Sequence, residues 1–240
     1  MAPARTRSPE GRRRTQLSMD AVMTEAVALL DEAGESALTF RALAERLGAG
    51  VASVYWYVAS KDELLDRATD HVLGGVLTEI DAHPVTDDPV DDLRRIAVTL
   101  FDAIDQRPWL GAYFMRNTKV VGNSLLMYER LGQQTLRMDL TARQRFHAVA
   151  AVVDFVIGMA ANLGQEPPVE VLAGQTTREQ YLEQMVTGWR ELDPDRFPYM
   201  HEILDEVATH VDRDQFLAGL DLTLAGLRLQ AGVSEAPRRR

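Results

Sequence analysis

The sequence contains no cysteine, which excludes disulfide bonds and thiolate metal sites. It also has no uninterrupted apolar run of the ~20 residues that a membrane span requires. The most apolar segment, residues 146–163, is broken by Asp154 and Asn162 and falls short of that length. No apolar stretch follows the basic N-terminus, as it would in a secretion signal. We therefore expect a cytoplasmic protein without membrane contact.

Motifs that carry enzyme chemistry are missing as well. The sequence has no G-x-x-x-x-G-K-[ST], G-x-S-x-G or H-E-x-x-H, and residues 48–50 lack the third glycine of a dinucleotide-binding loop. His147 and Asp154 lie seven residues apart on one helical face, either as a polar pair or, as is more common, in an interfacial hydrogen bond. The other four histidines are scattered. We therefore expect no catalytic residues, no metal and no cofactor.

Acidic residues outnumber basic residues, but the two kinds are unevenly distributed along the chain. The net charge is -10, yet residues 1–16 contain five arginines and one glutamate. Arginines among Pro, Ser and Gly cannot bury an apolar face, so we expect residues 1–16 to form a disordered basic arm. Such an arm either enters a DNA minor groove or only increases solubility.

The rest of the chain has the periodicity of an all-α protein. Apolar residues recur at intervals of three and four after capping residues such as Ser18 and Thr39. Ser60 and Glu63 fit a capping box that opens a long helix to about residue 83. Gly74-Gly75 within it indicates either a hinge or close packing. No strand pattern is present, and we expect the Val-rich residues 169–172 to lie in a loop.

Residues 39–61 have the pattern of a helix-turn-helix. Two short apolar-periodic segments flank a tight turn at residues 48–50. The second segment begins with the small side chains of Val51, Ala52 and Ser53, which let a backbone approach base edges in a major groove. This pattern predicts a DNA-binding element.

The motif residues are Leu43-Ala44, Leu47-Gly48-Ala49, Val54-Tyr55-Trp56-Tyr57-Val58 and Ser60-Lys61-Asp62-Glu63-Leu64. With this spacing, residues 18–66 resemble the TetR family of bacterial transcriptional regulators, and the Tyr-Trp-Tyr-Val run resembles its tetracycline-repressor subgroup. The resemblance implies an all-α homodimer that binds a near-palindromic double-stranded DNA operator and a small-molecule inducer. Residues 17–66 would form the helix-turn-helix DNA-binding domain, and residues 67–240 the helical ligand-binding and dimerisation domain.

The resemblance also implies roles for individual residues of the motif. Contacts to phosphates would come from Thr39, Arg41, Tyr57 and Lys61. Contacts to bases would come from Val51, Ala52, Ser53 and Trp56, while Tyr55 would be a packing residue. The chain departs from the family pattern at Gly50, where a Ser or Thr cap is common, and at Tyr57, where His is common.

Candidate ligand-binding residues are bulky apolar side chains of the second domain with one polar group among them. They are Phe101, Trp109, Phe114, Met127, Phe155, Met159, Asn162 and Trp189. Aromatic and Met side chains at helical spacing also form ordinary cores, so this pattern alone leaves both interpretations open. Asn162 beside Met159 on a buried face would need a polar partner.

Two helical segments carry small residues on one side and predict a dimer interface. Residues 141–164 are apolar on more than one side and include Ala151, Gly158 and Ala161. The closing helix, about residues 213–231, carries Gly219 and Gly226. Two such helices per chain favour a four-helix interface between two copies.

These features predict a ligand-responsive DNA-binding regulator. The favoured form is a repressor that an apolar or aromatic small molecule releases from its operator. Two alternatives stay open. One is a regulator without a ligand that is controlled by a protein partner, and the other is a helical small-molecule-binding protein or enzyme.

Overall fold

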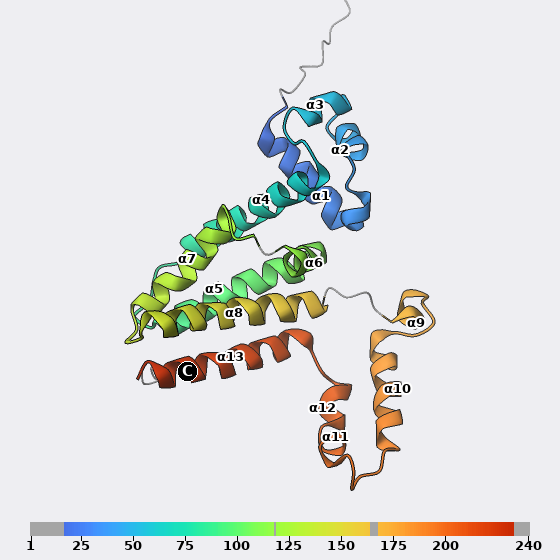
Figure 1. Cartoon of the computed structure of the whole chain (residues 1–240). Coiled ribbons are helices and arrows are strands. Elements are labelled where there is room, and N and C mark those ends of the chain that lie inside the picture. The colour runs from blue at the N-terminus through green and yellow to red at the C-terminus, as the bar shows by residue number, and fades with distance from the viewer. Residues whose placement is uncertain (1–16, 118, 164–167, 233–240) are drawn as a thin grey trace, which may run out of the picture. The chain divides into compact units, whose positions relative to one another are not determined.

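The computed structural model describes residues 17–117, 119–163 and 168–232. The expected basic arm at residues 1–16 lies outside these ranges. All regular structure in the described part is helical, which confirms the all-α fold class (Figure 1). The chain divides into an N-terminal and a C-terminal unit between Ala68 and Thr69, whereas the sequence-based boundary is at residue 66.

The N-terminal unit contains three helices and the beginning of a fourth: α1 (Met19–Ala37), α2 (Phe40–Arg46), α3 (Val51–Tyr55) and α4 (Lys61–Asp81). The caps predicted at Ser18 and Thr39 are confirmed, since each side chain accepts a hydrogen bond of 3.1 Å from a first-turn amide. Ser60 likewise accepts from the amide of Glu63 at 3.1 Å, while the Glu63 carboxylate accepts from the amide of Ala59 at 2.8 Å.

An apolar core holds these helices together. Its members, all almost fully buried, include Val22, Ala26, Leu30, Leu43, Ala44, Val54, Val58, Leu64 and Ala68. At the surface, Arg46 of α2 forms ion pairs with Glu25 and Glu32 of α1 at 2.9 and 2.5 Å. This core fixes the orientation of α3, the second helix of the predicted helix-turn-helix.

The C-terminal unit contains the rest of α4 and nine further helices in the described residues. They are α5 (Pro89–Asp105), α6 (Pro108–Arg116), α7 (Asn123–Leu136), α8 (Ala142–Leu163), α9 (Val169–Leu172), α10 (Arg178–Arg190), α11 (Pro198–Glu202), α12 (Leu204–Ala208) and α13 (Asp212–Gln230). The expectation of a loop at residues 169–172 is wrong, because Pro168 starts one helical turn there, with the Leu172 amide 3.0 Å from the Pro168 carbonyl.

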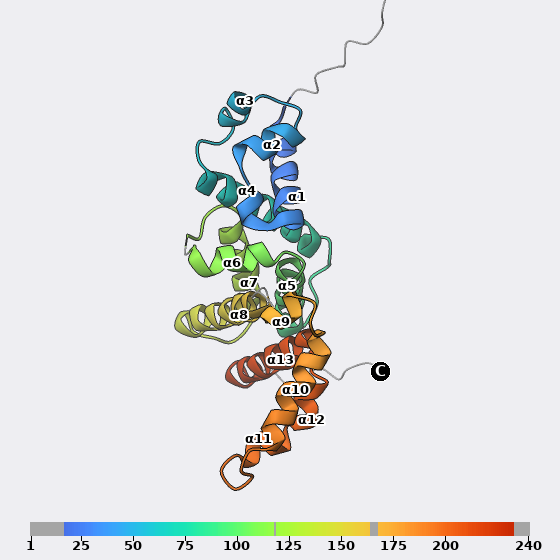
Figure 2. The ribbon, with the colours of Figure 1, turned by 90° about the vertical axis from the view of Figure 1, so that its right-hand side faces the viewer.

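Helix α8 is the centre of this unit and packs against α5, α6, α7 and α13 (Figures 1 and 2). Aromatic rings fill the layer between α5, α8 and α13. Phe101 stacks on Phe216 with ring centroids 3.7 Å apart, and Phe155 lies 5.8 Å from Phe216. A Cβ atom on Gly219 would lie 2.5 Å from Phe155, so α13 needs glycine there.

Helix α8 has the length and composition of a membrane span over Ala142–Asn162, the one such segment among the described residues. The expectation that the apolar stretch is too short is therefore wrong, since the helix begins four residues before Phe146. Length and composition are weak grounds, however, because the core helix of a soluble protein also meets them. Val152, Val153 and Val156 of α8 are buried against the neighbouring helices.

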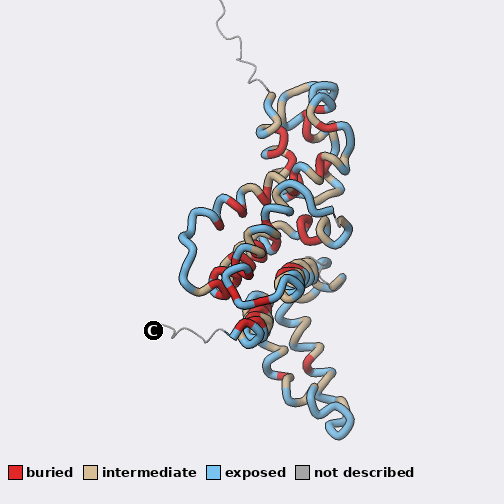
Figure 3. The backbone as a smooth tube through the Cα atoms, turned by 60° about the vertical axis from the view of Figure 1, so that its left-hand side comes forward, coloured by how far each residue is buried: buried red, intermediate tan, exposed pale blue. Residues whose placement is uncertain are grey.

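Helices α9 to α12 form a segment that packs mainly on itself. Helix α10 lies against α11 and α12. The buried apolar residues of this segment, among those described, are Val186 on α10 and Leu204 on α12. Figure 3 shows this segment largely in the colours of exposed and intermediate residues. Its core is small in comparison with the layer around α8.

Helices α4 and α7 are joined by hydrogen bonds between Asp70 and Asn123. The Asp70 carboxylate accepts from the Asn123 amide at 2.7 Å and from Asn123 Nδ2 at 3.1 Å, while the Asp70 carbonyl accepts from Nδ2 at 2.8 Å. A Cβ on Gly74 would lie 3.1 Å from Asn123 Nδ2, whereas one on Gly75 would have no neighbour within 4 Å. Close packing on α7 therefore accounts for Gly74.

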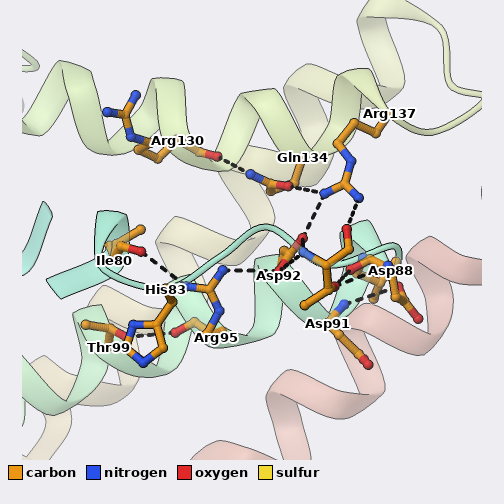
Figure 4. Close-up of polar contacts among 12 residues, drawn as sticks. Ile80, His83, Asp88, Asp91, Asp92, Arg95, Thr99, Arg130, Gln134 and Arg137 are labelled. Carbon is orange, nitrogen blue, oxygen red and sulfur yellow. Dashed lines mark hydrogen bonds and ion pairs between the residues drawn. The ribbon is translucent and has the colours of Figure 1, made fainter. Parts of the chain in front are cut away.

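A buried carboxylate, Asp92, holds the start of α5 (Figure 4). It accepts from Arg137, the C-cap residue of α7, at 2.8 Å, from Arg95 at 3.1 Å and from the Thr86 amide at 3.0 Å. Burial alone would raise the pKa of Asp92, but the bonds from Arg137, Arg95 and Thr86 outweigh it and lower that pKa. The ionised form of Asp92 therefore stabilises the fold.

We predict that Asp92→Asn lowers the free energy of unfolding by about 3 kcal/mol, because two guanidinium groups lose their shared buried partner. Because the folded-state pKa is lowered, this stabilisation is present above the unfolded pKa of about 3.9 and is lost as the pH falls through the folded value. Urea unfolding of both proteins across acidic pH measures the effect. Asp87→Asn, at an exposed neighbouring position, is the control. An unchanged stability for Asp92→Asn would contradict this role.

Candidate DNA-binding surface and ligand cavity

The four predicted base-contacting residues lie on the exposed side of α3 and at its end. Val54 is fully buried and anchors the helix, whereas Val51, Ala52 and Ser53 are exposed. Trp56 is 89% exposed, although indole is among the side chains most costly to leave in water. The helix therefore presents one large aromatic group and three small side chains on an accessible surface.

Tyr55 has the packing role expected for it, but at the surface. Its ring stacks on Phe40 of α2 with centroids 4.3 Å apart and an interplanar angle of 7°. The contact ties the end of α3 to α2. Gly50 occupies the N-cap position of α3 and supplies no side-chain hydrogen bond.

Two of the four candidate phosphate contacts have side chains exposed near the start of α2. Thr39 uses its hydroxyl to accept from the Ala42 amide, so the hydroxyl proton is left available for an incoming acceptor. Arg41 is exposed and makes no polar contact within the described residues. Both side chains are therefore accessible to a phosphate group.

Tyr57 and Lys61 have polar groups that are already engaged within the N-terminal unit. The Tyr57 hydroxyl donates to the carbonyl of Leu17, before α1. Lys61 Nζ donates to the carbonyl of Glu35, in the last turn of α1, at 2.7 Å. The sequence pattern gave no indication of these bonds. The first ties the start of α1 to the segment between α3 and α4, and the second ties the end of α1 to the start of α4.

A cavity of about 460 Å³ lies among α4 to α8 in the C-terminal unit. Its lining residues come from five helices and from the segment between α6 and α7: Leu73, Leu100, Phe114, Met115, Asn117, Lys119, Val120, Ser124, Met127, Tyr128, Val153, Asp154, Ile157 and Gly158. A volume of this size lies within the range of small-molecule sites.

The cavity contains only two of the eight predicted ligand residues, Phe114 and Met127. Phe101 and Phe155 are core residues that stack with Phe216. Trp109 is also buried in the core, at 6% exposure.

The remaining three candidates do not line the cavity either. Met159 and Trp189 are half-buried elsewhere, with Trp189 on α10. Asn162 is exposed, so the expectation that it lies on a buried face is wrong: the outer side of α8 near its C-terminal end is uncovered in the single chain. Leu73 had no sequence signal, because the cavity residues meet only through the tertiary packing of α4 to α8. Asp154 was marked as a break in the apolar segment and as a neighbour of His147, but not as a cavity residue.

The five predicted dimer residues occupy different places. Ala151 and Gly226 line a groove of about 270 Å³ between α8 and α13. Gly158 is exposed and lines the ligand cavity. Ala161 and Gly219 pack within the chain, Ala161 beneath Gly111 of α6 and Gly219 against Phe155.

Helix α13 presents two further apolar side chains beside this groove. Leu222 is 77% exposed and Leu229 is 85% exposed. They are seven residues apart on one helix face, so they form an apolar strip next to Gly226. Both leucines lie on the face of α13 opposite its buried residues Phe216, Leu220, Leu224 and Leu227. The sequence analysis missed them because it considered only the small residues of this helix as interface residues.

Metal-binding groups are not clustered in the part of the chain that the structure describes. No three His, Asp or Glu side chains there are arranged to hold an ion. Charged side chains of the C-terminal unit instead form ion pairs or line the cavity.

Family models match both units of the chain. Residues 22–68 match the model of bacterial regulatory proteins of the tetR family, and residues 83–231 match the tetracyclin repressor-like C-terminal domain. The chain therefore belongs to the TetR family of transcriptional regulators. Regulators of this family bind DNA operators and small molecules and act as dimers.

Two curated relatives are transcriptional regulators. An HTH-type transcriptional regulator of Saccharopolyspora erythraea is 33% identical over 153 residues, which are 62% of this chain and 63% of that protein. The HTH-type transcriptional repressor DrrR1 of Streptomyces coeruleorubidus is 27% identical over 232 residues, covering 93% of this chain and 82% of the repressor. The chain thus spans just under two thirds of the first relative.

Solved structures share the fold along nearly the whole chain. SCO7222, a TetR regulator of Streptomyces coelicolor, is 35% identical with a TM-score of 0.75, covering 90% of this chain and 99% of its own. ActR of Streptomyces coelicolor, in complex with actinorhodin, has a TM-score of 0.74 at 23% identity, covering 91% and 100%. The likeness to ActR shows the fold alone.

We predict that Lys61→Met lowers the free energy of unfolding by about 1 kcal/mol, because the charge-assisted bond to the α1 carbonyl is lost. Tyr57→Phe, which removes the bond to Leu17, has an effect of similar size. Arg41→Met is the matched control and leaves stability unchanged, since Arg41 makes no polar contact in the described chain. Thermal unfolding of the three variants provides the comparison. If all three unfold like the parent protein, the two bonds have no structural role.

Proposed function

We propose that this protein is a cytoplasmic, ligand-responsive repressor that leaves its operator when an apolar or aromatic small molecule fills the cavity among α4 to α8. The cavity carries the ligand part of the proposal. DrrR1 is named a repressor and ActR was solved with actinorhodin, and both facts support extending these properties to this chain.

The proposed DNA contacts divide into two groups. Trp56 and residues 51–53 would contact base edges, where methyl and aromatic groups meet the thymine methyl group. Arg41 and Thr39 would contact phosphates, with Tyr57 and Lys61 contributing as far as their internal bonds allow. Phosphate contacts set register and base contacts carry sequence information, so the two groups should differ in their response to salt.

Helix α4 is the proposed route by which the ligand signal travels. Leu73 of α4 lines the cavity, and Asp70, one turn earlier, is bonded to Asn123 at the start of α7. The N-terminal turns of the same helix carry Leu64 and Leu65 of the DNA-binding core. A ligand that displaces α4 therefore changes the position of the element on which α3 is built, and regulatory coupling of about 1–3 kcal/mol is typical.

Dimerisation is proposed to use the groove between α8 and α13. Ala151 and Gly226 allow another helix to approach closely there, and Leu222 and Leu229 offer apolar area that a single chain leaves in water. Two copies of this surface related by twofold symmetry would form a four-helix interface. A dimer would bring two copies of α3 to one near-palindromic operator.

We expect Trp56→Ala to bind a duplex selected from a random pool about tenfold more weakly than the parent protein, because a base contact is worth ~1–3 kcal/mol. The salt dependence should stay unchanged, whereas Arg41→Ala should reduce its slope by about one. Fluorescence anisotropy at several salt concentrations measures both. Wild-type affinity in Trp56→Ala would remove it from the interface, and failure of the pool to yield any bound duplex would refute the function.

The dimer prediction concerns Leu222→Glu combined with Leu229→Glu. Two carboxylates in an apolar interface should raise the dimer dissociation constant by about 100-fold or more, seen as monomers in sedimentation velocity. Gly226→Leu should act in the same direction by preventing close helix approach. Val85→Glu, at another exposed apolar position of the C-terminal unit, should stay dimeric. A dimeric double variant would place the interface elsewhere.

A further inference from the structure

The cavity has apolar walls and a polar edge. Leu73, Leu100, Phe114, Met127 and Ile157 supply apolar surface from five helices. Burial of an apolar ligand against such walls gives the free energy of binding, while a few polar groups decide its orientation. The identity of those polar groups therefore sets the class of ligand.

Tyr128 of α7 and Asp154 of α8 are the pair that defines this polar edge. Both line the cavity, and they are near enough for the charge of Asp154 to add to burial in raising the pKa of Tyr128. The phenol is therefore protonated at neutral pH and has a proton to donate, whereas an ionised carboxylate only accepts. A donor and an acceptor thus line the same cavity, one from α7 and one from α8.

The surroundings of Asp154 leave room for a flat ring. Gly158 is one helical turn further along α8, and a Cβ there would have no atom within 4 Å. A ring system can therefore lie directly against α8 beside the carboxylate. Lys119, the basic residue of the lining, lies on the segment between α6 and α7, whereas Asp154 lies on α8, one turn from Gly158.

The rim of the cavity is also apolar. Met115 and Val120 line the cavity and are 63% and 42% exposed. Val121, Leu125 and Leu126 continue exposed apolar surface into the first turn of α7. A large apolar molecule can enter across this apolar part of the rim.

Building on the proposed function, we propose that the cavity selects multi-ring aromatic compounds that carry a neutral hydroxyl group at one edge. Asp154 accepts the hydrogen bond of that hydroxyl, and Tyr128 donates to an oxygen of the same edge. Carboxylic acids of the same ring system are disfavoured, because their charge would meet that of Asp154. Asp154 is thus a specificity-determining residue.

The test uses three compounds with one ring system: 2-hydroxyanthraquinone, 2-methoxyanthraquinone and anthraquinone-2-carboxylate. Isothermal titration with the full-length protein, without DNA, gives each dissociation constant at a pH where the hydroxyl is neutral. Asp154→Ala removes the acceptor at an exposed position, so the fold should persist, and thermal unfolding checks this. Asp139→Ala, an exposed carboxylate outside the cavity lining, is the matched control.

The expected result is about tenfold tighter binding of the hydroxy than of the methoxy compound, as for one hydrogen bond to a charged group. This preference should fall to about twofold or less in Asp154→Ala, which should also bind the carboxylate better, and should persist in Asp139→Ala. Equal binding of the first two compounds, a preference that survives Asp154→Ala, tightest binding of the carboxylate by the parent protein, or no binding of any compound would overturn the proposal.

The binding measurement is independent of the proposed repressor function. If the hydroxyl preference is found but the bound compound leaves operator affinity unchanged, the proposed release mechanism fails and the ligand class stands. If a different compound releases the protein from DNA while the hydroxyl preference is absent, the function stands and the ligand class is wrong.

Discussion

The hydrogen-bonded joint between Asp70 and Asn123 is the contact on which the proposed regulation depends. It fixes α7 to α4 by three bonds of 2.7 to 3.1 Å, and Gly74 allows the two helices to approach one turn later. The cavity lies near this joint, since Leu73 on α4 and Ser124, the residue after Asn123, are among its lining residues. A ligand between these helices must either fit the joint or displace it, and α4 is the one helix that both units share.

The helices were largely predictable because their signals are local. Capping residues act within one turn, so Ser18, Thr39 and Ser60 marked helix starts that the structure confirms. The short helix α9 was missed because a single turn has no periodicity to detect. The family was identified from the helix-turn-helix motif, whose residues are adjacent in sequence.

The ligand cavity was much less predictable. Aromatic size suggested Phe101 and Phe155, yet large rings fill space, and here they close the layer around Phe216. A cavity forms where side chains from several helices do not fill the space between them. The periodicity of a single helix carries no information about that space. Asp154 was noted as a break in the apolar segment and together with His147, although Asp154 lines the cavity among α4 to α8 and His147 lines the groove beside α13.

The central claim is that the joint between α4 and α7 transmits ligand binding to the DNA-binding unit. Asn123→Ala removes the side-chain bonds to Asp70 and keeps the backbone bond, so ligand and operator should each still bind. The direct measurement is operator affinity of this variant with and without a saturating ligand that releases the parent protein. We expect the ligand-induced loss of affinity to shrink by about fivefold or more, the lower end of a typical coupling. A loss of affinity as large as that of the parent protein would contradict the account.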